Sequence, residues 1–230
     1  MFVWNEYRSA AEVDEALAQA VADALAQTLQ QKGAAVLAVS GGRSPVGFFE
    51  ALSRKPLAWN KISVTLVDER IVPTGHEDSN TALVRRHLLK NAAAAASWIP
   101  MVDDEAANGL QPEAASTYAR LHFRQPDVAV LGMGGDGHTA SLFPESPQLA
   151  AGIDPDNTDG LLHTTPVTAP HERISMTLKA VTDTPHLFLA IRGSSKKDVF
   201  ERAAAQADAQ YPVSLVLNQK GVQCHVFYAD

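Results

Sequence analysis

Short apolar runs alternate with segments of helical periodicity along this 230-residue chain, and that alternation restricts its fold more than any other feature. Apolar side chains recur every four residues from Val13 to Leu29, which predicts an amphipathic helix ending near Gly33. Strands are predicted at 34–40, 62–67, 127–134, 173–178, 186–192, 214–218 and 223–229. Further helices are predicted at 46–53, 79–90, 112–123 and 194–207. This order is typical of an α/β fold with an open, mostly parallel sheet and helices on both faces.

The chain shows no linker and no internal repeat, so residues 1–230 are expected to form a single domain. A smaller subregion around 145–185 is expected to pack on the main sheet, and residues 150–165 are predicted to be loop. The alanine-rich stretch 91–97 either extends the preceding helix or forms a connector.

The charge and cysteine content exclude several classes of protein. A net charge of −7 argues against nucleic-acid binding, which needs a basic face. Neither a membrane-spanning apolar run nor a signal-peptide pattern is present, so a cytoplasmic protein with no membrane partner is expected. The single cysteine, Cys224, lies in an apolar run and is predicted to be a buried structural thiol. The sequence does not fix the number of subunits, and we expect a monomer.

The first candidate ligand-binding segment is Ser-Gly-Gly-Arg-Ser-Pro at 40–45, between a predicted strand and a predicted helix. Gly41 and Gly42 let the backbone turn and approach a ligand, and a helix N-terminus offers free N–H groups to a phosphate. Ser44 is predicted to cap the helix, with Pro45 in its first turn. An ordinary strand-to-helix turn explains the segment equally well.

The second candidate is Asp68-Glu69-Arg70, directly after a predicted strand. Charges at the carboxyl end of a strand lie where open α/β sheets bind ligands. Arg70 can bind a phosphate through its guanidinium fork, or act in catalysis as a cation that stabilises an oxyanion. Asp68 can accept a proton or bond a sugar hydroxyl. The alternative is a solvated charge cluster.

The third candidate is the stretch 131–144, in which four glycines fall within six positions. Its closely spaced N–H groups, including that of Gly134, can surround an anionic or polar ligand. His138 ends this loop and can accept a proton from water, and Asp136 can orient its ring. A structural histidine is the alternative, but the neighbouring aspartate and glycines favour a catalytic base.

The fourth candidate is Arg-Gly-Ser-Ser-Lys-Lys at 192–197, where a strand again leads into a helix. Ser194 or Ser195 is predicted to cap the helix. Lys196 and Lys197 fall in the first turn, where a cation opposes the helix dipole unless an anion compensates it. Surface lysines are the alternative, and the choice between the two lysines stays open.

Other mechanisms lack their signatures. The remaining histidines show no HExxH or Cys–His spacing, so no metal is expected. There is no GxSxG motif of the α/β-hydrolases.

Taken together, these segments resemble the 6-phosphogluconolactonase family over nearly the whole chain. The matching stretches are SGGRSP at 40–45, VDERIVP at 67–73, Ser79-Asn80, LGMGGDGHTASLFP at 131–144, Arg173 and GSSK at 193–196. The resemblance implies a sugar-phosphate isomerase-like, Rossmann-like fold. It also implies cofactor-free hydrolysis of 6-phospho-D-glucono-1,5-lactone, in the oxidative pentose phosphate pathway.

The resemblance further implies His138 as general base. It implies phosphate and sugar contacts from Gly41, Gly42, Arg43, Ser44, Arg70 and Lys196. Two alternatives are kept. One is a glucosamine-6-phosphate deaminase or isomerase, although the DER ending and the residues after His138 favour the lactonase. The other is a non-catalytic sugar-phosphate sensor, although no helix-turn-helix precedes the first predicted strand.

Overall fold

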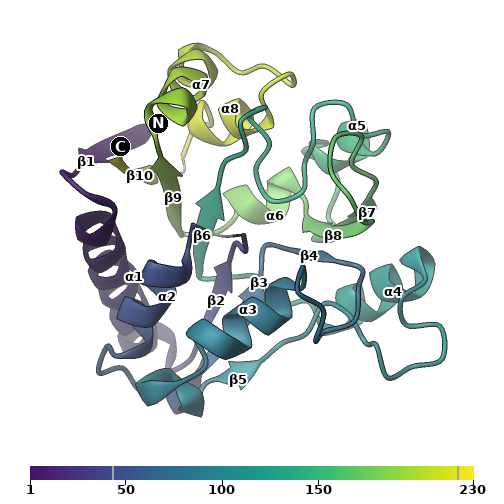
Figure 1. Cartoon of the computed structure of the whole chain (residues 1–230), viewed down its shortest axis with the longest axis horizontal. Helices are drawn as coiled ribbons and strands as arrows, with labels where there is room; N and C mark the ends of the chain where they lie inside the picture. Colours follow the sequence, from purple (N-terminus) through teal and green to yellow (C-terminus); the bar gives the residue numbers. More distant parts are fainter. Residues whose placement is uncertain (43, 222) are drawn as a thin grey trace.

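A computed structural model describes residues 1–42, 44–221 and 223–230 (Figure 1). Its main sheet has seven strands, and all the described pairings between them are parallel. Their spatial order is β1 (Phe2–Glu6), β10 (Cys224–Ala229), β9 (His186–Arg192), β6 (Val128–Gly132), β2 (Ala35–Val39), β3 (Ile62–Leu66) and β5 (Ser97–Trp98). The predicted open parallel α/β sheet is therefore confirmed.

A second, antiparallel sheet has the order β4 (Asp68–Arg70), β8 (Arg173–Met176) and β7 (Leu161–Thr164). It is joined to the main sheet where the Met176 N–H donates to the Val67 carbonyl at 2.8 Å, just beyond β3. The subregion expected around 145–185 thus packs on the main sheet through β4. Residues 150–165 are only partly loop, since residues 161–164 form β7, which pairs with β8 in this sheet.

Helix α1 (Ala10–Lys32) begins at Ser9, whose hydroxyl accepts the Glu12 N–H, and ends at Gly33 as predicted. It packs against β10, β9, β6 and β2. The other helices are α2 (Val46–Ser53), α3 (Asn80–His87), α4 (Pro112–His122), α5 (Leu149–Gly152), α6 (Leu178–Thr182), α7 (Ser194–Ala205) and α8 (Pro212–Leu217), with 3₁₀ turns at Trp59–Lys61 and Asn91–Ala95. The alanine-rich stretch is thus a connector that leads into β5. Within the described ranges, no helix is long and apolar enough to span a bilayer.

The core surrounds the middle of the main sheet. Consecutive residues 128–131 of β6 are all buried, which requires cover on both faces because neighbouring side chains point to opposite sides. Cys224 is fully buried as predicted, and burial raises the pKa of its thiol to about 12.

The prediction of a strand at 214–218 is wrong, because residues 214–217 belong to α8 and Asn218 follows its end. Pro212 occupies the first helical turn, where its missing N–H costs nothing. Val213, Val216 and Leu217 follow at helical spacing and are buried. Strand β1 was not predicted, and it forms the sheet edge beside β10, from the other end of the chain.

Two predicted helix caps are also wrong. Pro45, not Ser44, is the residue before α2, and it offers no side-chain bond. Gly193 precedes α7, so neither Ser194 nor Ser195 caps it. Both helices follow a glycine turn. The predicted serines therefore do not cap the first N–H groups of either helix.

The strand order reverses between β2 and β6. On one side of β2 the sheet continues through β3 to β5. On the other side lies β6, and from there the sheet continues through β9 and β10 to β1. In open α/β sheets, ligands bind outside the carboxyl ends of the strands at such a reversal. The segments that follow β2 and β6 are the two predicted glycine-rich loops.

Candidate active site

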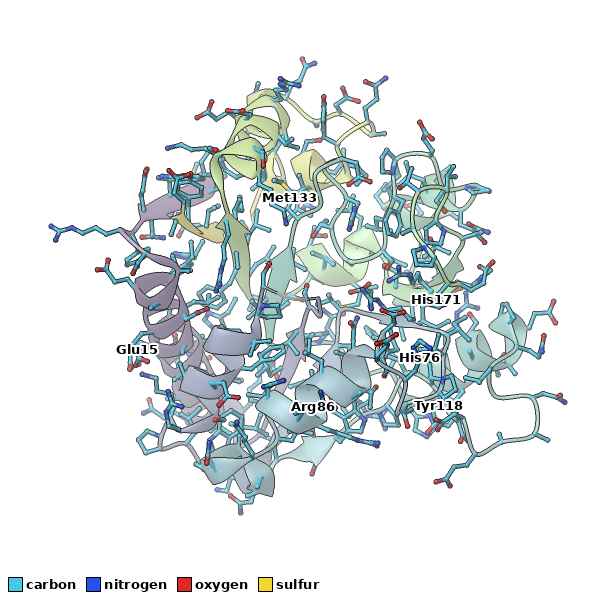
Figure 2. All side chains as sticks on the ribbon, in the orientation of Figure 1. Glu15, His76, Arg86, Tyr118, Met133 and His171 are labelled. Carbon is cyan, nitrogen blue, oxygen red and sulfur yellow. The ribbon has the colours of Figure 1, made fainter. Side chains whose placement is uncertain are left out.

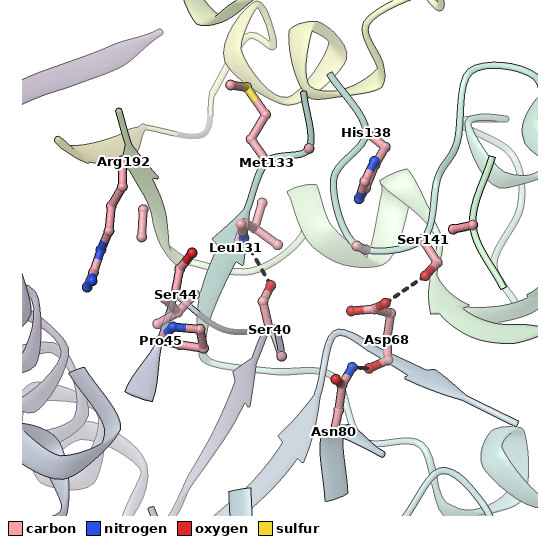
Figure 3. A pocket seen from close by; sticks show the side chains of 18 of the residues that line it. Ser40, Ser44, Pro45, Asp68, Asn80, Leu131, Met133, His138, Ser141 and Arg192 are labelled. Atoms are coloured by element: carbon pink, nitrogen blue, oxygen red, sulfur yellow. Dashed lines mark hydrogen bonds between the residues drawn. The ribbon is translucent and has the colours of Figure 1, made fainter. Parts of the chain in front are cut away.

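A cavity of about 340 Å³ lies at the carboxyl ends of β2, β6 and β9, at the reversal of strand order (Figure 3). The Gly132 N–H donates to the Ser40 hydroxyl at 3.0 Å and so joins the ends of β2 and β6 at its floor. The predicted residues among its lining are Gly41, Gly42, Ser44, Asp68, Arg70, Gly134, His138 and Lys196. Arg43 was also predicted, and it lies outside the described residues.

His138 is the histidine that lines this cavity within the described chain, and its ring points into it (Figure 3). Its Nδ1 lies 2.6 Å from Oδ1 of Asp136, and the same oxygen accepts the His138 backbone N–H at 3.1 Å. The ring also packs on Phe143, with 4.2 Å between centroids. Two contacts thus fix the ring and leave Nε2 for a ligand or water.

Asp136 is suited to hold a charged histidine. Burial raises the pKa of its carboxyl, but the hydrogen bonds and charge of His138 outweigh burial, so the pKa lies below its ordinary value. The carboxylate therefore stays ionised beside the ring. An ionised partner stabilises an imidazolium more than a neutral one does.

Two glycines in this loop are required by close contacts. A Cβ on Gly134 would lie 2.2 Å from Cε1 of His138, so any side chain there would displace the ring. Gly137 has φ +79°, and a Cβ on it would lie 2.7 Å from the Tyr211 ring. Ala140 also has a positive φ of 49°, a strained conformation of the kind often found at functional sites.

The Asp68-Glu69-Arg70 segment divides its side chains between the cavity and the protein interior. Asp68 lines the cavity, and its Oδ2 accepts the Ser141 hydroxyl at 2.6 Å. Glu69 faces away and is buried, and its oxygens accept the backbone N–H groups of Arg70, Asn80 and Thr81 as well as two hydroxyls. Burial raises the pKa of Glu69, and these hydrogen bonds oppose that rise. Glu69 therefore anchors the start of α3 rather than binding a ligand.

Arginines gather around the cavity. Arg70 and Arg173 lie directly opposite each other in β4 and β8, and both line the cavity. Burial lowers the pKa of the Arg173 guanidinium, and the charge of Arg70 lowers it further. Nε of Arg70 is buried and has no hydrogen-bond partner within the described chain. Two guanidinium cations that face each other repel, and an anion bound between them relieves that repulsion.

A third arginine, Arg192, enters the cavity from the end of β9, beside Ser44 and Pro45 (Figure 3). Asp14 of α1 forms an ion pair with it. The fourth candidate segment in the sequence includes Arg192, but no role in the site was predicted for it, because its position at the end of a strand does not show where its side chain points. Only the strand-end rule that pointed to Asp68 could have indicated it.

The structure separates Lys196 from Lys197. Lys196 lines the cavity, and burial lowers the pKa of its amine while the charge of Asp136 raises it. Lys197 instead forms an ion pair with Glu6 at 3.3 Å and lies over the rings of Trp4 and Tyr228. Lys196 is therefore the lysine placed to meet a ligand.

Fold and site together define an α/β protein of the class that binds ligands at the carboxyl ends of parallel strands. The model of the family "Glucosamine-6-phosphate isomerases/6-phosphogluconolactonase" matches residues 8–226. The chain belongs to this family. Within it, the chain falls with the lactonases, which are hydrolases, because full-length relatives at 61% identity are 6-phosphogluconolactonases.

A 6-phosphogluconolactonase of Neisseria meningitidis is 61% identical over the full length of both chains. A solved structure from Neisseria gonorrhoeae superposes with a TM-score of 0.98 at 61% identity, with full coverage of both chains. A 6-phosphogluconolactonase structure from Shewanella baltica superposes with a TM-score of 0.91 at 31% identity, covering 100% of this chain and 98% of that one.

Proposed function

We propose that this chain hydrolyses 6-phospho-D-glucono-1,5-lactone to 6-phospho-D-gluconate, in the oxidative pentose phosphate pathway. The observation that carries the proposal is the pair of Asp136 and His138, 2.6 Å apart, beside a cavity lined with cations. The full-length relatives of high identity bear the corresponding name, which favours this substrate over glucosamine 6-phosphate.

The phosphate is bound by cations and by backbone N–H groups. Gly41 and Gly42 line the cavity between the end of β2 and the start of α2, where a backbone without side chains can approach an anion closely. Arg70 and Lys196 supply positive charge from β4 and α7. A phosphate fixed in this way holds the lactone ring with its C1 carbonyl towards His138, which reduces the entropy cost of the reaction.

His138 acts as the general base. Because Nδ1 bonds Asp136, Nε2 takes a proton from water as the water oxygen forms its bond to C1. The N–H groups of Gly132, Gly134 and Gly137 already donate to acceptors within the chain, so a cation that lines the cavity stabilises the oxyanion of the tetrahedral intermediate. The bond between C1 and the ring oxygen then breaks, and the histidinium returns its proton to that oxygen. No cofactor is needed, because a lactone is already activated.

The test generates the lactone in place from glucose 6-phosphate with its dehydrogenase, and detects the product with 6-phosphogluconate dehydrogenase. We expect wild type to accelerate product formation over the spontaneous reaction. His138→Ala should lose about 10²–10⁴-fold in kcat, the usual contribution of a general base.

The matched control for that variant is His163→Ala. His163 also bonds a carboxylate, with 2.5 Å to Glu172, but it is not among the residues that line the cavity. This control should keep wild-type turnover. Near-normal turnover of His138→Ala would remove the base from its role, and no acceleration by wild type would refute the lactonase proposal. Glucosamine 6-phosphate would then be the next substrate. A single domain, a monomer and a cytoplasmic location stay predictions.

A further inference from the structure

The two facing arginines of the small sheet are held by carbonyl oxygens from two loops. Nη1 of Arg70 donates to the Asp78 carbonyl at 2.5 Å. Nη2 of Arg173 donates to the Pro170 carbonyl at 3.0 Å, and its Nε donates to the His171 carbonyl at 3.4 Å. The direction of each guanidinium therefore depends on where these loops lie.

A hydrogen bond between two side chains joins the same two loops. Nε2 of His171 lies 3.0 Å from Oδ2 of Asp78, although the residues are 93 positions apart. Figure 2 shows His171 close to His76, and the centres of these two rings are 5.7 Å apart. The Asp78 N–H donates to Nδ1 of His76 at 3.1 Å, which fixes the backbone of Asp78.

The backbone of His171 is strained, and this strain shows that contacts around the residue hold the turn in place. Its φ is 70°, a left-handed conformation that a residue with a Cβ adopts only when the surroundings impose it. This turn presents the carbonyls of 170 and 171 to Arg173. The side chain of His171 is held by the bond to Asp78 and by its contact with the His76 ring, and both oppose relaxation of the turn.

We propose that Asp78 and His171 are positioning residues that aim Arg70 and Arg173 at the substrate phosphate. This inference rests on the proposed function. Asp78 holds Arg70 through its carbonyl and, through His171, holds the turn that orients Arg173. The pair does not touch the reacting carbonyl, so it affects phosphate binding equally in the ground state and in the transition state. Its loss raises KM and leaves kcat nearly unchanged.

The test measures KM and kcat for Asp78→Ala and His171→Gly. Glycine adopts a positive φ without strain, so His171→Gly keeps the turn accessible and removes only the link. We expect KM to rise about tenfold in both variants with kcat within about twofold. Asp78→Asn retains an acceptor oxygen and should recover part of the loss.

The control is His163→Ala, which breaks a histidine–carboxylate pair of similar exposure in β7. The His163 side chain is 27% exposed and the His171 side chain 28%. KM of this variant should stay within about twofold of wild type. An unchanged KM in His171→Gly, or an equal rise in His163→Ala, would overturn the proposal.

Calorimetric binding of inorganic phosphate gives a readout that does not depend on turnover. Asp78→Ala and His171→Gly should each weaken phosphate binding relative to wild type and His163→Ala. If wild type does not hydrolyse the lactone but the two variants still lose phosphate affinity, the proposed function fails and the positioning role stands. If phosphate affinity is unchanged in both variants, the positioning role fails.

Discussion

Asp136→Asn tests the charge of the carboxylate that bonds Nδ1 of His138, because it removes this charge and keeps the geometry of the hydrogen bond. Oδ1 of Asp136 accepts both the His138 ring N–H and the backbone N–H, and an asparagine oxygen in the same place accepts both. Its amide nitrogen then takes the place of the other carboxylate oxygen. The substitution therefore removes the negative charge that stabilises the imidazolium formed when water is deprotonated.

The size of the effect follows from the hydrogen bond that is weakened. A hydrogen bond to a charged group contributes about 1.5–3 kcal/mol, against about 0.5–1.5 kcal/mol for a neutral one. The side chains of His138 and Asp136 are 29% and 34% exposed, so solvent screening reduces the difference between the charged and the neutral hydrogen bond. A loss of about 1–1.5 kcal/mol corresponds to a fall of about 5- to 15-fold in kcat.

The coupled lactone assay measures this fall, with the spontaneous rate subtracted. Asp136→Asn should lie between wild type and His138→Ala, with KM nearly constant. A kcat equal to that of wild type would refute the role of the carboxylate, and a kcat as low as that of His138→Ala would show that the ring had lost its orientation.

The same variant has a pH dependence of stability with a defined sign. The pKa of Asp136 is depressed in the folded state, so its contribution is complete above the ordinary aspartate value of 3.8 and is lost as pH falls through the folded value. The difference in free energy of unfolding between wild type and Asp136→Asn should therefore shrink below about pH 4. Urea unfolding from pH 3 to pH 7 measures it.

Two further predictions use the same preparation. Lys196→Ala should raise KM about 10- to 100-fold by removing a charge-assisted phosphate contact, whereas Lys197→Ala, whose amine is engaged with Glu6 and two rings, should leave KM unchanged. Equal effects of the two would contradict the placement of the lysines. Glu69→Gln should lower the free energy of unfolding by about 2–4 kcal/mol, because every contact of its carboxylate is a donor and an amide nitrogen must face at least one buried backbone N–H. That loss lowers Tm by about 4–16 °C in a thermal melt, and an unchanged Tm would show that α3 does not need this carboxylate.

Local patterns in the sequence were sufficient to predict an element where its own residues carry the pattern that identifies it. The strand predicted at 186–192 has the bounds of β9, and α1 ends at Gly33 as its periodicity indicates. The glycine-rich loop before His138 combines several signals within a few residues. Its two required glycines, Gly134 and Gly137, are each set by contacts to one ring.

Segments whose conformation depends on distant partners were not predictable in this way. Residues 214–218 form a short apolar run, which periodicity alone does not distinguish from a strand. Strand β1 exists because β10, more than two hundred residues later, pairs with it. Similarly, Asp14, the partner of Arg192, lies on α1, so the sequence could show this arginine but not the direction of its side chain.

The way the cations are held explains how a chain with a net charge of −7 can bind an anionic sugar. Arg70 and Arg173 donate to carbonyl oxygens, which fix a guanidinium without cancelling its charge. The neighbouring carboxylate of Glu69 is turned away from the cavity and is occupied by N–H and hydroxyl donors. The carbonyl contacts therefore leave both guanidinium charges in place, although the charges of Asp68, Glu69 and Asp78 also act on Arg173. Because those carbonyls belong to loops joined by Asp78 and His171, the proposed positioning role predicts that the strength of phosphate binding depends on residues that do not touch the phosphate.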